Sequence, residues 1–186
     1  MGDIMRTLII NGSRRDGNCK KICDILKQSL RKERIISNVI TPGNQKIYLC
    51  TGCMDCDESG VCDFNDDMYE NIEKIKKSDC LIFVTPTRWN LLSGDIKIFM
   101  DRLNPLYVPK GLKNKLCIAI AVGASDKEDF STNGAISSID SFCERSEMKL
   151  ILKYQFNNCL LQNDINDKQD LVNDMIQNIK ETLKSI

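Results

Sequence analysis

The feature that most constrains the fold is a series of short, continuous apolar runs, the clearest of which is Asp79–Thr85 (DCLIFVT). A run of this length without polar alternation is typical of a parallel strand that is covered on both faces. Segments of helical spacing lie between the runs, and in the first of them Ile22, Leu26 and Leu30 recur on one face. This alternation predicts a parallel sheet with helices on both sides.

Five strands and five helices are expected along the chain. The expected strands are Arg6–Asn11, Arg34–Ile40, Asp79–Thr85, Lys115–Val122 and Lys149–Phe156. The expected helices are Asn18–Lys32, Met68–Lys77, Gly94–Leu103, Ala135–Arg145 and Asp167–Ser185. We expect Lys46–Leu49 to be a short extended piece and Cys50–Cys62 to be a loop. The pattern suits a single α/β domain over residues 1–186, a three-layer sandwich with a five-stranded parallel sheet in the order 2-1-3-4-5.

The charge balance argues against two classes of partner. Lys plus Arg equals Asp plus Glu, at 26 each, so the formal net charge is zero. Proteins that bind nucleic acids or membrane surfaces usually carry a basic excess, so we expect neither partner. No apolar run approaches the roughly 20 residues that span a bilayer. Asn11–Arg15 stands where a signal-peptide cleavage site would lie, so we expect a cytoplasmic protein.

The chain has 10 cysteines and no histidine. The lack of histidine excludes Ser-His-Asp and Cys-His catalysis, as well as zinc sites with a histidine ligand. Structural disulfides are not expected in a reducing cytosol. Cys50, Cys53, Cys56 and Cys62 have the spacing C-x2-C-x2-C-x5-C. Four thiolates this close in sequence can ligate a [4Fe–4S] cluster or a zinc ion, and a loop of free thiols is the third interpretation.

Ligands of open parallel sheets bind beyond the C-terminal ends of the strands, which directs attention to the loops there. The loop after the first strand, Asn11–Cys19, joins a strand to a helix, a geometry that presents free N–H groups to a phosphate. Ser13 and Asn18 add neutral donors, and Arg15 adds charge. The alternative is an ordinary strand–helix turn in which Asn18 is the N-cap.

The loop after the third strand, Thr85–Asn90, contains a proline that restricts the bend and a tryptophan with a large flat face. Such a loop suits the ring of a bound cofactor. The alternatives are a solvent-exposed Arg88 and a Trp89 that packs in the core. Val122–Ser125 follows the fourth strand at the same edge, and its alternative is an ordinary solvated loop.

Taken in order, these segments resemble the NAD(P)H-dependent FMN reductases and the related iron–sulfur flavoproteins. The resemblance is carried by GSRRDGN at 12–18, by the cysteine motif with Asp66-Asp67-Met68, and by TPTRW at 85–89 with Ser93 and Asp101-Arg102. It runs from the first strand to the third helix, and beyond Ser125 only the element pattern is compatible. It implies a flavodoxin-like fold that binds FMN.

The resemblance also implies which residues form the flavin site. The residues that would hold the FMN phosphate are Ser13, Arg15, Gly17, Asn18 and Cys19. Those around the ring would be Pro86, Thr87, Arg88, Trp89 and Ser93, with Gly123 and Ser125 close by. Cys19 departs from the family's usual Ser or Thr and is a weaker donor. Arg88 departs from an aromatic residue, and facing the N1–C2 edge its charge would stabilise the anionic reduced flavin.

The implied function is an FMN-dependent oxidoreductase of the NAD(P)H:acceptor type, in which the flavin carries the chemistry and no catalytic side chain is needed. The alternative is an iron–sulfur flavoprotein that takes electrons from ferredoxin, with a [4Fe–4S] cluster on Cys50, Cys53, Cys56 and Cys62. A second alternative is a non-catalytic, flavodoxin-like binding module. The resemblance further implies a homodimer or homotetramer, with Asn104–Gly111 as a candidate contact.

Overall fold

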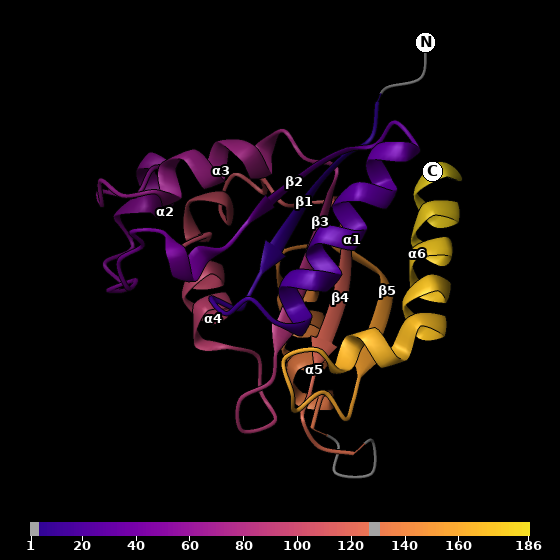
Figure 1. Cartoon of the computed structure of the whole chain (residues 1–186). Helices are drawn as coiled ribbons and strands as arrows, with labels where there is room; N and C mark the ends of the chain where they lie inside the picture. Colours follow the sequence, from indigo (N-terminus) through magenta and orange to yellow (C-terminus); the bar gives the residue numbers. More distant parts are fainter. Residues whose placement is uncertain (1–3, 127–130) are drawn as a thin grey trace.

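A single parallel sheet forms the centre of the molecule (Figure 1). The computed structural model describes residues 4–126 and 131–186. The strands are β1 (Arg6–Asn11), β2 (Ile36–Ile40), β3 (Cys80–Pro86), β4 (Leu116–Val122) and β5 (Lys149–Phe156). Their order is β2-β1-β3-β4-β5, and all neighbouring pairs are parallel. The predicted strand number, direction and order are confirmed.

Helices cover both faces of the sheet and complete the three layers (Figure 1). One face packs against α1 (Asn18–Lys32) and α6 (Gln169–Lys184), and the other packs against α3 (Met68–Lys76), α4 (Gly94–Asp101) and α5 (Asn133–Arg145). The short elements are α2 (Asp55–Ser59) and the 3-10 turns η1 (Pro42–Asn44), η2 (Asn104–Leu106) and η3 (Asp164–Lys168). No helix of the described residues is both long enough and apolar enough to cross a membrane.

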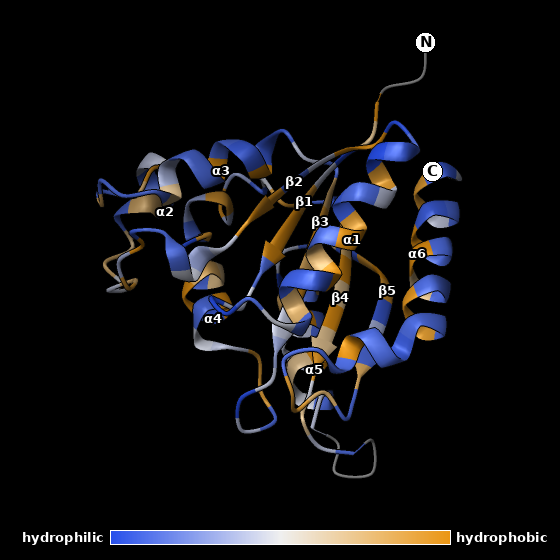
Figure 2. Cartoon of the chain, in the orientation of Figure 1, coloured by the Kyte–Doolittle hydropathy of each residue, from blue (hydrophilic) through white to orange (hydrophobic). Residues whose placement is uncertain are grey.

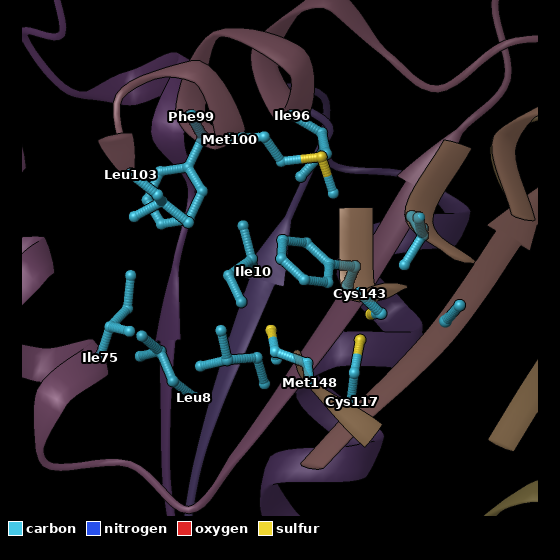
Figure 3. Close-up of a cluster of buried hydrophobic side chains, with 14 of the residues drawn as sticks. Leu8, Ile10, Ile75, Ile96, Phe99, Met100, Leu103, Cys117, Cys143 and Met148 are labelled. Carbon is cyan, nitrogen blue, oxygen red and sulfur yellow. The ribbon is translucent and has the colours of Figure 1, made fainter. Parts of the chain in front are cut away.

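The sheet divides the core into two layers because successive side chains of a strand point to opposite faces. In β1, Leu8 and Ile10 face the layer under α3, α4 and α5, while Ile9 faces the layer under α1 and α6. Figure 3 shows the first layer, where Ile96 and Phe99 of α4 lie over the strands. In Figure 2 the mostly apolar strands lie between helices whose outer faces are polar, as the alternation of apolar runs and helical segments predicts.

Three segments differ from the expectation. Arg34 adopts a left-handed backbone (φ 62°), so β2 begins only at Ile36. Lys46–Leu49 is not a strand, because carboxylates of Asp66 and Asp67 take its backbone N–H groups: Tyr48 N–H donates to Asp66 and Lys46 N–H to Asp67. The predicted loop Cys50–Cys62 contains α2. The other helices start or end within two residues of the expected bounds.

The cysteines are all free, as expected. Cys80 and Cys117 are fully buried in β3 and β4, where they pack as small hydrophobic side chains.

Candidate functional site

A cleft of about 710 Å³ lies beyond the C-terminal ends of β1, β3, β4 and β5. This is the edge at which ligands of open parallel sheets bind, and the volume is typical of a small-molecule site. Ten of the predicted flavin-site residues line this cleft: Ser13, Arg15, Gly17, Asn18, Cys19, Pro86, Thr87, Arg88, Trp89 and Ser125. Ser93 and Gly123 do not. The fold therefore brings three loops, distant in sequence, to one place.

Helix α1 points its N-terminus at the cleft, and this end has no side-chain cap. Gly17 occupies the N-cap position and has no side chain with which to accept the first N–H groups. The first turn of a helix leaves N–H groups without intrahelical partners, and the helix dipole makes this end positive. The cleft thus contains a helix terminus with the properties of an anion site, and no side chain of the described residues caps it.

Two arginines add positive charge to this end of the cleft. Arg15 and Arg88 line it, and both act on the buried Cys19 thiol: burial and the charge of Cys159 raise the pKa of Cys19 to about 12, while the two arginines oppose the rise. Neither forms an ion pair with any residue in the described ranges. The adjacent Arg14 differs, because it makes a bidentate pair with Asp95 (2.7 and 3.1 Å) outside the cleft.

Asn18 is not the N-cap of α1, so the alternative interpretation of this loop is wrong on that point. Its side-chain N–H groups donate to the carbonyl of Leu161 (2.8 Å) and more weakly to that of Cys159 (3.4 Å), and its oxygen accepts from Ile165 N–H (3.1 Å). The side chain therefore joins the start of α1 to the segment after β5. It leaves only the backbone N–H of Asn18 for a ligand.

The loop after β3 is a tight turn. Arg88 and Leu91 exchange backbone hydrogen bonds (2.9 and 3.0 Å), and Trp89 and Asn90 between them adopt left-handed backbone angles. Trp89 is 98% exposed, which contradicts the interpretation that it packs in the core. It stands at the rim of the cleft with its ring free to cover a bound molecule.

Ser93 and Gly123, the two predicted residues that do not line the cleft, stabilise the elements next to it. Ser93 is buried as the N-cap of α4, where its hydroxyl accepts from Ile96 N–H and its own N–H donates to Thr85. A Cβ on Gly123 would lie 2.3 Å from the Ser131 hydroxyl, so only glycine allows the end of β4 to approach the start of α5 this closely.

Sequence reasoning missed the segment Cys159–Gln162, which forms one wall of the cleft. The signal was available, because β5 is parallel to the other strands and its C-terminal end must reach the same edge. Leu160 and Leu161 are exposed there, at 72% and 67%. They give the cleft an apolar side that the polar loop Asn11–Cys19 lacks.

A separate small cavity is lined by Cys50, Cys53, Cys56 and Cys62, and we call it the cysteine hollow. Cys56 is buried and Cys50 and Cys53 are exposed. No three Cys, Asp or Glu side chains of the described residues lie close enough to hold one metal ion. A cluster takes one thiolate at each of four corners, and all four thiols line this one cavity.

Side chains at the end of α4 contact two of these sulfurs. Arg102 donates to Cys62 Sγ (3.5 Å), and the side chain of Asn104 donates weakly to Cys56 Sγ (3.9 Å). Arg102 pairs with Asp66, whose burial would raise the pKa of that carboxyl, but hydrogen bonds from Arg102 and from backbone N–H groups lower it overall. The carboxylate is therefore charged, and so is its partner.

A second cleft, of about 730 Å³, opens beside the cysteine hollow. It is bordered by Cys50–Gly52, by the segment around Tyr107 and by the end of α5. It lies away from the C-terminal ends of the strands. We therefore take the first cleft as the cofactor site.

Comparison with known proteins identifies a family whose sequence model this chain matches. The family model described as NADPH-dependent FMN reductase matches residues 5–157. An iron-sulfur flavoprotein of Methanocaldococcus jannaschii is 34% identical over 122 residues, which is 65% of this chain and 63% of that protein. An iron-sulfur flavoprotein of Archaeoglobus fulgidus is 30% identical over 116 residues, 62% of this chain and 53% of that protein. The chain thus spans between about half and two thirds of the length of these relatives.

Solved structures share the fold at low identity. A flavone reductase superposes with a TM-score of 0.73 at 18% identity, covering 97% of this chain and 63% of that one. The NAD(P)H:quinone oxidoreductase from Methanothermobacter marburgensis superposes with a TM-score of 0.71 at 15% identity, covering 98% of both chains. Both likenesses are evidence of the flavodoxin-like fold alone.

Proposed function

We propose, from the premise that this chain belongs to the NADPH-dependent FMN reductase family, that its cleft binds FMN and that the protein transfers electrons through this flavin. When bound, FMN supplies the redox chemistry, since it accepts and releases electrons without a catalytic side chain. The protein's part is to bind the flavin, orient it and set its electrostatic surroundings.

One observation supports the proposal most strongly: the uncapped N-terminus of α1 enters the cleft beside two arginines without ion-pair partners in the described ranges. Helix N-termini bind phosphate through free N–H groups and the helix dipole. Arg15 would add charge-assisted hydrogen bonds to the same group. Pro86, Thr87, Trp89 and Ser125, which also line the cleft, would then hold the ring.

The test separates the phosphate contact from the rest of the binding energy. Flavin-free protein is titrated with FMN and with riboflavin, which lacks the phosphate. We expect FMN to bind more tightly, and Arg15→Met to reduce the FMN-to-riboflavin affinity ratio about tenfold, or ~1.4 kcal/mol. Arg14→Met is the matched control, because Arg14 pairs with Asp95 outside the cleft. Equal affinities of the parent for both flavins would refute the phosphate site.

The electron donor is proposed from the family and not from a feature of the cleft. A nicotinamide nucleotide, NADH or NADPH, is the first candidate, and ferredoxin is the second. Anaerobic mixing of the FMN-loaded protein with each donor decides between them, because reduction bleaches the flavin absorbance. Bound FMN that no donor reduces would instead support a non-catalytic binding module.

A second function is favoured by the cysteine hollow. Four cysteines line one cavity, and two of their sulfurs accept N–H hydrogen bonds. The curated relatives cited above are named iron-sulfur flavoproteins. We propose that Cys50, Cys53, Cys56 and Cys62 bind a [4Fe–4S] cluster, which would pass electrons one at a time.

Iron and acid-labile sulfide in protein purified without oxygen test the cluster. We expect about four irons per chain, and their loss in Cys56→Ala. Cys23→Ala is the control, since Cys23 is buried on the inner face of α1, away from the hollow. A parent protein that binds FMN but takes up no iron on reconstitution would be a flavin reductase with a loop of thiols.

A further inference from the structure

Arg102 is a buried arginine whose position the flavin site does not explain. It follows α4 directly, is 1% exposed, and pairs with the fully buried carboxylate of Asp66 through two hydrogen bonds (2.5 and 3.1 Å). Arginine is always charged in proteins. Removing such a pair from water is costly, so buried ion pairs are weak evidence for stability and call for another explanation.

The pair holds both ends of the segment that carries the four cysteines. On the near side, Arg102 donates to the carbonyl of Tyr48 (2.8 Å), and Asp66 accepts from Tyr48 N–H (2.9 Å). On the far side, Arg102 donates to Cys62 Sγ (3.5 Å), and Asp66 accepts from Met68 N–H (3.0 Å). One ion pair therefore closes the loop from residue 48 to residue 66.

The charge of Arg102 also lies close to the cysteine hollow, in surroundings of low polarity. The guanidinium sits 4.9 Å from the centre of the Phe64 ring and lines the hollow with all four cysteines. Its Nε is buried with no partner among the described residues. A positive charge acts more strongly in such surroundings than in water.

We infer that Arg102 is a positioning residue of the cysteine hollow: fixed by Asp66, it sets the place of Cys62 and favours the reduced state of a cluster bound there. The inference rests on the proposed cluster. A cluster that took one electron from the reduced flavin would gain one negative charge, and no bond would be made or broken. The N–H donor of Arg102 to Cys62 Sγ, together with the positive end of the Arg102–Asp66 pair that contacts this sulfur, would stabilise the added charge and so raise the reduction potential.

The decisive variant removes both charges together, so that neither is left buried alone. Arg102→Met with Asp66→Asn is reconstituted with iron and sulfide, and its cluster is titrated anaerobically by electron paramagnetic resonance. We expect FMN and iron contents like those of the parent. At the parent's midpoint we expect the reduced-to-oxidised ratio to fall about tenfold, which is ~59 mV for one electron.

A second measurement needs no cluster. In iron-free protein, hydrogen exchange at the amides of Tyr48 and Met68 reports whether Asp66 and Arg102 still close the loop. We expect faster exchange in the double variant and in Arg102→Lys, which keeps the charge but loses the planar fork. Arg14→Met with Asp95→Asn is the matched control: the same residue types in a bidentate pair, here through Nε and Nη2 of the arginine, with Arg14 exposed, Asp95 partly buried and both outside the hollow.

The outcomes separate the inference from the function on which it rests. A parent protein that takes up no iron refutes the cluster and the electrostatic role of Arg102, and the exchange experiment then decides the positioning role alone. A parent that binds the cluster, with a double variant of unchanged potential and unchanged exchange, overturns the inference while leaving the proposed function intact. A potential that falls equally in the control variant also overturns it.

Discussion

The side-chain amide of Asn18 donates a hydrogen bond to the carbonyl of Leu161 at 2.8 Å, although 143 positions separate the two residues. The same side chain accepts from Ile165 N–H. Two walls of the cleft, the start of α1 and the segment after β5, are thereby held together by one buried residue.

We expect Asn18→Ala to lower the free energy of unfolding by about 1–3 kcal/mol, because it leaves the buried N–H of Ile165 and the partly buried carbonyl of Leu161 without this partner. The same change loosens the wall of the cleft, so bound FMN should dissociate faster. Urea denaturation and stopped-flow flavin release measure the two effects. Asn163→Ala, which alters an exposed amide in the same segment, should stay within ~0.5 kcal/mol of the parent.

Gly123→Ala should destabilise the protein and weaken FMN binding. The added Cβ would meet the Ser131 hydroxyl at 2.3 Å and the Thr132 methyl at 2.9 Å, forcing α5 away from the cleft. Overpacking of this kind costs about 1–3 kcal/mol. Gly94→Ala is the control, since nothing lies within 4 Å of its Cβ, and it should change the unfolding free energy by less than ~1 kcal/mol. Equal effects of the two substitutions would contradict this account.

Arg88→Met should lower the midpoint potential of bound FMN. Arg88 lines the cleft without an ion-pair partner in the described ranges, so its charge is available to stabilise the anionic reduced flavin. A loss of ~1.4 kcal/mol corresponds to about 30 mV for a two-electron couple. Spectroscopic redox titration measures the shift, and Arg14→Met should leave the potential in place. An unchanged potential in Arg88→Met would show that its side chain faces away from the ring.

The ion pairs that join α1 to α6 should weaken in acid. Glu33, just after α1, pairs with Lys180 and Lys184 of α6, and their hydrogen bonds lower its pKa from 4.5 to about 2. Because the pKa is lower in the folded state, the stabilisation is complete above the unfolded value and is lost as the pH falls from about 5 to about 2.

Glu33→Gln should therefore have a lower melting temperature than the parent at pH 6, and the gap should narrow as the pH approaches 2. Thermal unfolding followed by circular dichroism across this range provides the measurement. Glu144→Gln is the control, because this exposed side chain of α5 is in no ion pair of the described residues, and its melting temperature should stay close to that of the parent at pH 6. A gap for Glu33→Gln that is constant with pH would rule out the ion pairs as its source.

Much of the fold could be predicted from the sequence because its signals are local. A buried parallel strand is a short apolar run, as in Leu81–Val84, and an amphipathic helix repeats its apolar residues every three to four positions. The loop Asn11–Cys19 could be placed at the cleft for the same reason, since a glycine-containing strand–helix junction has a short sequence signature. The prediction failed where local signals competed. Lys46–Leu49 has the composition of an extended segment, but it forms no strand because its backbone N–H groups donate to carboxylates.

Only the tertiary structure decided which side chains meet. Asn18 is read locally as a helix cap, yet its partners come from the other end of the chain. Asp66 and Arg102 each belong to a recognisable motif, but only the packing of α4 against the cysteine segment joins them as a buried pair. The sequence by itself determined the strands and helices, because burial and periodicity act within short stretches, and the general connection rules of parallel sheets then predicted the strand order and the edge where the cleft opens. Contacts between distant residues depend on how the layers pack, and no local pattern encodes them.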